Sequence, residues 1–108
     1  MMSIFSKRLR DARTAAGLSQ EQLGIESGID PASASARMNQ YENNRHRPNP
    51  VTIMQIAAVL KVPPAYFYSV DDEEAQLLLL FYRLDPPGKK QILALAIELR
   101  SIESALKH

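Results

Sequence analysis

The stretch "SQEQLGIESGIDPASASARMNQYENN" (residues 19–44) decides the fold, because it holds two helix-start signals separated by a glycine. Ser19 is followed three residues later by Gln22, a spacing typical of a capping box at a helix N-terminus. Gly28 marks the end of that helix. Asp30-Pro31 is the second start signal, because Asp accepts from free N–H groups and Pro suits a position whose N–H would be unpaired. We therefore expect a further helix running to about residue 43.

Apolar periodicity extends this helical pattern in both directions along the chain. It predicts helices over residues 4–16, 51–62, 73–84 and 89–106, with a short helical piece after the prolines at 63–64. No segment alternates with period two, so no strand is expected. "VDDEE" (70–74) separates two composition regimes, and "DPPG" (85–88) is interpreted as a turn. The sequence thus predicts an all-α protein with a head at residues 1–70 and a helical hairpin at residues 71–108.

Composition narrows the functional classes. Cysteine is absent, which excludes disulfides and thiolate metal sites, and the two histidines are His46 and His108. Without a glycine-rich phosphate loop or paired catalytic carboxylates, we expect neither an enzyme nor a cofactor or metal site. No apolar run approaches the ~20 residues of a membrane span, so a cytoplasmic protein is expected. Residues 1–70 carry eight Lys and Arg against five acids, while residues 71–108 carry five against seven. This favours a polyanion-binding head with a separate tail.

The helix ending near residue 43 has one apolar side and one polar side. At ~100° per residue, Ala34, Met38 and Tyr41 share a packing side. Asn and Gln side chains can pair with adenine in a major groove, Arg can pair with guanine, and a small Ala permits close approach. The predicted base-reading residues are therefore on the opposite side: Ser33, Ala36, Arg37, Asn39 and Gln40.

"LSQEQLGIESGI" (18–29) and "MNQYENNRHRPNPVTIMQIAAVLKV" (38–62) together resemble the Cro/CI-type (XRE) helix-turn-helix repressors, over about residues 6–68. The resemblance implies a five-helix lambda-repressor-like DNA-binding domain in residues 1–70. It also implies a transcriptional regulator, a repressor in that family, that binds double-stranded DNA. Gly24 and Gly28 would let the two central helices approach, with Ile29 filling the gap between them.

Several residue roles follow only from this resemblance. Arg13 and Glu42 match a structural ion pair between the first helix and the recognition helix. The family's contacts to the DNA phosphates map onto Gln20, Asn43, Asn44, Arg45 and Arg47. His46 is a weaker candidate for the same task.

One departure from the family pattern is visible. Ile29 and Glu42 are thirteen residues apart, four more than usual. We expect the extra residues to add a turn to the N-terminus of the recognition helix; the competing interpretation is a longer loop, with Ser33 or Ser35 as N-cap. The choice bears on Ser33, Ala36 and Arg37 as base readers. Three cations of the first helix, Lys7, Arg8 and Arg10, are interpreted as solvated surface charges rather than phosphate contacts.

The tail is too apolar to remain solvated. Residues 73–84 are apolar almost all round, and residues 89–106 carry a seam at spacings of three and four. We predict a homodimer built by these residues: Leu77, Leu80, Phe81, Leu84, Ile92, Leu95, Leu99 and Ile102. Two recognition helices would then read an inverted-repeat operator. The alternatives are a tail folded onto its own head and an antitoxin-type autoregulator whose tail binds a toxin or another protein. A protein-interaction or RNA-associated adaptor without an operator is a further alternative.

Overall fold

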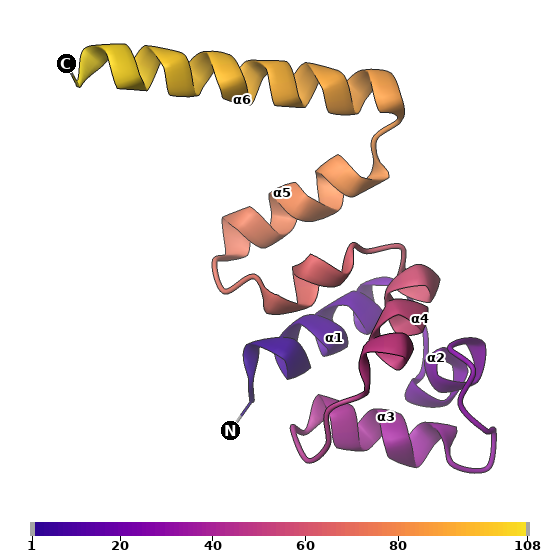
Figure 1. The fold of residues 1–108 in the computed structure, drawn as a ribbon. Coiled ribbons are helices and arrows are strands. Elements are labelled where there is room, and N and C mark those ends of the chain that lie inside the picture. Colours follow the sequence, from indigo (N-terminus) through magenta and orange to yellow (C-terminus); the bar gives the residue numbers. More distant parts are fainter. Residues whose placement is uncertain (1, 108) are drawn as a thin grey trace.

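The structure is a computed structural model that describes residues 2–107 of the 108-residue chain. Every regular element in this part is a helix, which confirms the all-α prediction (Figure 1). The elements are α1 (Ile4–Ala15), α2 (Gln20–Glu26), α3 (Ala34–Glu42), α4 (Pro50–Leu60), the 3-10 helix η1 (Pro64–Tyr68), α5 (Asp72–Arg83) and α6 (Pro86–Leu106).

The core of the head draws one fully buried side chain from each of its five helices. These are Leu9, Leu23, Met38, Ile56 and Phe67. Burying a side chain of this size contributes roughly 1.5–3 kcal/mol. Since no helix of the head exceeds twelve residues, this shared burial stabilises the helices more than their own propensities do.

Short-range signals fix where the helices begin. The capping box at Ser19 is complete, with the Ser19 hydroxyl accepting from the Gln22 amide at 3.0 Å and the Gln22 side chain accepting from the Ser19 amide at 3.1 Å. Asp85 caps α6 by accepting from Gly88, and Pro86 occupies the first helical position. The prediction of a turn over residues 85–88 was therefore wrong. An Asp-Pro pair suits a helix start as well as a turn.

The two tail helices relate differently to the head. α5 lies against η1, and its Ala75 is buried in the core of the head. α6 runs back beyond α5, on the side of the molecule away from α3, and none of its residues is buried (Figure 1). Only α5 is thus anchored to the head.

Arg8 joins the head to α5. Its side chain is buried; Nε donates to the Ser69 carbonyl at 2.9 Å, Nη2 donates to the Val70 carbonyl at 3.2 Å, and Nη1 lies 2.9 Å from the Asp72 carboxylate. The pKa of Asp72 is lowered, first by its hydrogen bond to Arg8 and then by Lys7. The interpretation of Arg8 as a solvated surface charge was wrong, because helical periodicity does not reveal the carbonyl oxygens of residues 69–70.

Candidate nucleic-acid interface

α3 packs directly on α2 because Gly24 has no side chain. A Cβ placed at Gly24 would lie 2.8 Å from the Ala34 Cβ and 2.9 Å from the Ala34 carbonyl oxygen. The turn after α2 uses a second glycine, Gly28, with a φ of +91° that other residues rarely adopt. Ile29 follows and packs half-buried against the core. These contacts set the position of α3 relative to α2.

The four extra residues lengthen the turn rather than the helix. Asp30 Oδ1 accepts from the Ala32 amide at 2.8 Å, and the Asp30 carbonyl accepts from the Ser33 amide at 2.9 Å. α3 begins only at Ala34, with Ser33 in the N-cap position but without a capping hydrogen bond from its side chain. The expected extra helical turn is thus wrong, and the competing longer loop is correct. Asp and Pro also favour turns, and the Asp30 side chain is used to close one.

α3 buries one side and exposes the other. Ala34, Met38, Tyr41 and Glu42 are buried. Ala36, Arg37 and Asn39 are exposed, and Gln40 is half-buried at the edge of the same side. Ser33 is half-buried and precedes the helix. Four of the five predicted base readers therefore lie on α3 itself, with Ser33 at its entrance.

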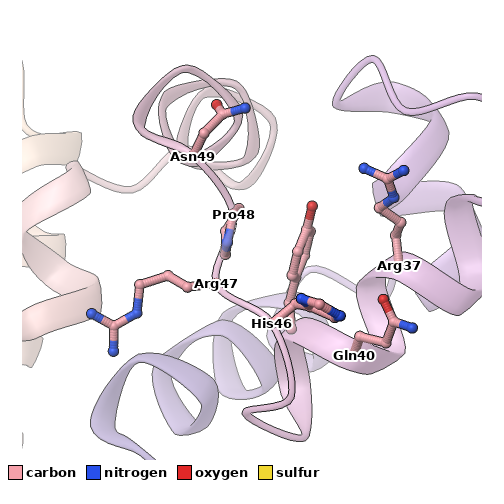
Figure 2. A pocket seen from close by; sticks show the side chains of 7 residues that line it. Arg37, Gln40, His46, Arg47, Pro48 and Asn49 are labelled. Atoms are coloured by element: carbon pink, nitrogen blue, oxygen red, sulfur yellow. The ribbon is translucent and has the colours of Figure 1, made fainter.

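Arg37 and Gln40 border an open cleft of about 410 Å³ between α3 and the loop at residues 43–49. Figure 2 shows their side chains on the same side of the loop as His46. Arg47 points the opposite way, with its guanidinium carbon 6.0 Å from the centre of the Phe5 ring (Figure 2). The side chains of His46 and Arg47 thus extend from the loop to opposite sides.

The loop is closed tightly onto the end of α3. Asn43 Nδ2 donates to the Asn39 carbonyl at 2.8 Å, and the Arg45 amide donates to the Gln40 carbonyl at 2.9 Å. Asn44 adopts a left-handed conformation with a φ of +58°, which Asn tolerates better than most residues. Asn43, Asn44, Arg45 and Arg47 are all exposed. The predicted phosphate-contacting residues of the loop are therefore accessible and held near α3.

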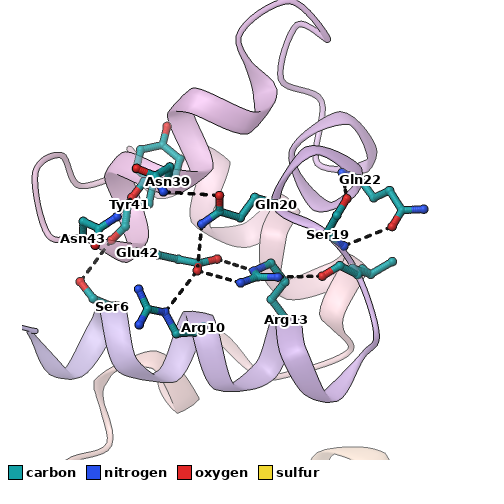
Figure 3. Close-up of polar contacts among 11 residues, drawn as sticks. Ser6, Arg10, Arg13, Ser19, Gln20, Gln22, Asn39, Tyr41, Glu42 and Asn43 are labelled. Atoms are coloured by element: carbon teal, nitrogen blue, oxygen red, sulfur yellow. Dashed lines mark hydrogen bonds and ion pairs between the residues drawn. The ribbon is translucent and has the colours of Figure 1, made fainter.

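A buried carboxylate clamps α3 to α1 and α2 (Figure 3). Glu42 is fully buried, and both of its oxygens pair with Arg13, with Nη2 to Oε1 at 3.0 Å. Gln20 Nε2 donates to Oε1 at 3.2 Å, and Arg10 Nε lies 3.5 Å from the same oxygen. Arg13 Nη1 also donates to the Leu18 carbonyl at 2.9 Å. The structure thus brings Arg13 and Glu42 together and adds two partners, Gln20 and Arg10, that sequence reasoning missed.

Gln20 connects this clamp to the exposed side of α3. Its Oε1 lies 3.5 Å from Asn39 Nδ2, while its Nε2 donates to Glu42 Oε1. Asn39 was predicted to read bases and Gln20 to bind phosphate. Their contact links the orientation of Asn39 to the buried ion pair.

Charge on this surface is one-sided. Between residues 31 and 70 the sequence has four basic residues, Arg37, Arg45, Arg47 and Lys61. The single acid in that span is Glu42, which is buried and paired. The exposed surface formed by α3 and the following loop therefore presents positive and amide groups without a competing carboxylate from this span.

The predicted dimerisation residues lie on the tail, away from α3. Leu77 and Leu80 on α5 are 54% and 56% exposed, and Leu99 on α6 is 50% exposed. Leu84, Leu95 and Ile102 are also exposed, whereas Phe81 and Ile92 are half-buried between the two helices. Within residues 2–107, no helix is both long enough and apolar enough to cross a membrane.

Comparison with known proteins places the chain in a family. The helix-turn-helix family model HTH_3 matches residues 9–67. An uncharacterized HTH-type transcriptional regulator, RghRB of Bacillus subtilis (strain 168), is 46% identical over 63 residues, which cover 57% of this chain and 42% of that protein. The crystal structure of the transcriptional regulator BswR superposes with a TM-score of 0.84 at 48% identity, covering 90% of this chain and 96% of that one.

The family match spans α2, α3 and the turn between them, where Gly24 and the clamp at Glu42 set the arrangement. It agrees with the expectation that the chain is not an enzyme. The chain belongs to the helix-turn-helix family of transcriptional regulators.

Proposed function

We propose that this protein is a homodimeric repressor that binds an inverted-repeat operator by placing α3 in the major groove of double-stranded DNA. The observation that carries the proposal is the exposed side of α3, where Arg37 and Gln40 project beside the basic loop and no tail residue up to 107 covers them. A helix with its side chains is roughly 10–12 Å across, close to the ~12 Å width of the major groove.

The side chains on α3 divide into specific tasks. Arg37 would pair with guanine and Gln40 with adenine, because each offers two polar groups in a fixed fork. Ala36 precedes Arg37 and lies one turn before Gln40, and it lets the backbone approach the groove floor or a thymine methyl group. Asn39 is the second side-chain amide on α3, and its contact with Gln20 limits its freedom before DNA is bound.

The backbone-contacting residues flank these readers. Asn43, Asn44 and Arg45 follow α3 directly, and Arg47 extends to the other side of the loop. Each basic contact would contribute close to one unit to the salt dependence of binding. Gln20 Nε2 gives one N–H to Glu42, and its second N–H could donate to a phosphate while that bond is kept.

Dimerisation is supported by the exposed leucines of α5 and α6. Leu80 and Leu95 are both more than half exposed, and apolar surface of this kind is rarely left solvated in a monomer. One recognition helix reads few base pairs, whereas two related by a two-fold axis can read half-sites about 34 Å apart. Repression would follow from occupying the promoter.

Selection of binding sites from random double-stranded DNA tests this proposal. We expect an enriched inverted repeat with half-sites about one helical turn apart. The matched control is Leu99→Glu, which places a charge on the exposed tail and leaves the head unchanged; it should lower affinity for the full repeat far more than for one half-site. Failure of the wild-type protein to enrich any sequence would refute the proposal. A second protein that copurifies on the tail and abolishes dimerisation would favour the antitoxin-type alternative instead.

A further inference from the structure

The hairpin has an apolar flank that neither helix covers. α6 meets α5 through Lys89, Leu93 and Ala96, whose ammonium or apolar groups lie against α5, and Ile92 lines the same cavity at the border between this side and the seam. The seam of α6 is a different side: Leu95, Leu99 and Ile102 are about half exposed. At ~100° per residue the centre of the seam lies about 90° from the side that meets α5.

α5 also has a row of exposed apolar residues that corresponds to the seam of α6. Leu77, Leu78 and Phe81 line the cavity of about 230 Å³ between the two helices, while Leu80 and Leu84 lie about 80–90° from the centre of that side. In both helices, viewed along the chain direction, a rotation of about 90° in the same sense about the helix axis leads from the exposed row to the contact side. Because α5 and α6 run in roughly opposite directions (Figure 1), equal rotations bring both rows to the same flank of the hairpin.

We propose that a second copy of this chain covers this flank, with the two α6 helices side by side and antiparallel about Ile97. The inference rests on the proposed function and adds the direction and register of the dimer contact. Ile92 of one copy then lies opposite Ile102 of the other, and Leu95 lies opposite Leu99. Each α6 contributes four seam residues to one continuous contact.

Symmetry favours this direction. The seam lies at about a right angle to the side of α6 that faces α5 and the head. A two-fold axis between antiparallel helices in contact through that seam points toward the heads, so both α3 helices face the same way. Parallel helices would place the axis along α6 and turn the heads to opposite sides. Only the antiparallel dimer lets two copies of α3 reach one duplex.

The charged residues beside the seam also favour the antiparallel arrangement of the two α6 helices. In a parallel, in-register pair, Glu98 would lie beside Glu103 of the second copy, and symmetry would repeat this like-charge contact. In the antiparallel pair, Glu103 lies beside Lys89 of the second copy, also twice, and the Lys89 side chain would turn from the rings of α5 to reach it. The one like-charge contact is between Glu98 of one copy and Glu98 of the second copy, at the two-fold axis. Opposite charges therefore outnumber like charges only in the antiparallel arrangement.

The length of α6 suits the spacing of half-sites. Residues 86 of the two copies would be 22 residues apart along the antiparallel pair, or about 33 Å at 1.5 Å per residue. In Figure 1, α3 lies beneath the N-terminal end of α6 rather than its C-terminal end. Two heads carried in this way would be separated by a distance close to the ~34 Å of one DNA turn.

Cysteine cross-linking tests the arrangement without interference, because the chain has no cysteine of its own. Ile92→Cys and Ile102→Cys are prepared separately, one with a mass tag, and are oxidised alone and as a re-equilibrated mixture. In the antiparallel dimer the mixture should give predominantly the mixed disulfide. Ile102→Cys alone should stay unlinked, since its two copies would be about 15 Å apart along the helices. Ile102 is about half exposed, so this substitution leaves the packing of the head intact.

Two outcomes would overturn the proposal: a disulfide in Ile102→Cys alone without the mixed product, which indicates parallel helices, or no disulfide in any sample, which means that the flank is not the contact. Site selection on the wild-type protein reports separately on the proposed function. An inverted-repeat motif together with a parallel cross-link would retain the repressor and discard this geometry. The mixed disulfide without any enriched motif would support this dimer geometry and refute the repressor.

Discussion

Replacing Arg13 with methionine should destabilise the protein by about 3–5 kcal/mol, because it leaves a buried carboxylate without its main partner. Glu42 has no exposed surface and receives both oxygen contacts from Arg13. After the substitution, Gln20 at 3.2 Å and Arg10 at 3.5 Å would remain, both on the same oxygen, Oε1. Oε2 would lose the hydrogen bond from Arg13.

The magnitude follows from the number of bonds lost. A hydrogen bond to a charged group contributes ~1.5–3 kcal/mol, and Arg13 makes two of them to Glu42. Arg10 can compensate part of the remaining charge, which favours the lower end, near ~3 kcal/mol. Arg10→Ala is the matched control; the Arg10 side chain is 43% exposed, so its loss should cost less than ~1 kcal/mol. The double variant Arg13→Met/Glu42→Met should be more stable than Arg13→Met, because no charge stays buried.

Urea denaturation followed by far-UV circular dichroism measures these differences, and a loss of ~3 kcal/mol should also lower Tm by at least about 10 °C. The reasoning would be refuted by a cost for Arg13→Met as small as that of Arg10→Ala. Glu42→Met is measured as well, and the reasoning would also fail if the double variant lost as much stability as Arg13→Met and Glu42→Met together, since that additivity would mean that Arg13 and Glu42 are not coupled.

Four further outcomes are expected. Gln40→Ala should cost ~1–3 kcal/mol at one operator position and relax base preference there, measured by competition among operator variants; equal weakening of all sequences would contradict base reading. Arg47→Ala should weaken binding to every sequence and reduce the slope of log K against log salt by ~1, and an unchanged slope would remove Arg47 from the phosphate contacts. Gly24→Ala should destabilise the head by ~1–3 kcal/mol in urea titrations, because the new Cβ would collide with Ala34. Asp72→Asn should reduce stability at neutral pH, and the difference from wild type should vanish as pH falls well below ~4, because a lowered pKa stabilises only while the carboxylate is ionised.

The sequence predicted the head better than its connections. Helix positions followed from periodicity, and the Ser19 capping box is present as expected, because both signals are local. The Asp30-Pro31 and Asp85-Pro86 pairs were both misinterpreted, in opposite senses: the first closes a turn and the second begins a helix. An Asp-Pro pair is compatible with either, and the surrounding packing decides.

The sequence also did not predict several contacts between segments that are distant along the chain. Family resemblance paired Arg13 with Glu42, but nothing in the local pattern indicated that Arg10 and Gln20 also reach that carboxylate. Arg8 looked like any surface cation, yet it binds the segment leading into α5. Such partners become visible only once the chain is folded, because they depend on carbonyl groups and side chains far away in sequence.

The attachment of Arg8 to the carbonyl groups of Ser69 and Val70 and to Asp72 fixes the start of α5 relative to the head. A regulator with a flexible linker between its DNA-binding head and its dimer contact could bind operators of several lengths, because each head could move independently. In the proposed dimer, insertion of one base pair at the operator centre would displace a half-site by about 3.4 Å and rotate it by about 35°, and the fixed joint at Arg8 would absorb neither. The proposed repressor should accordingly bind best to operators of a single length.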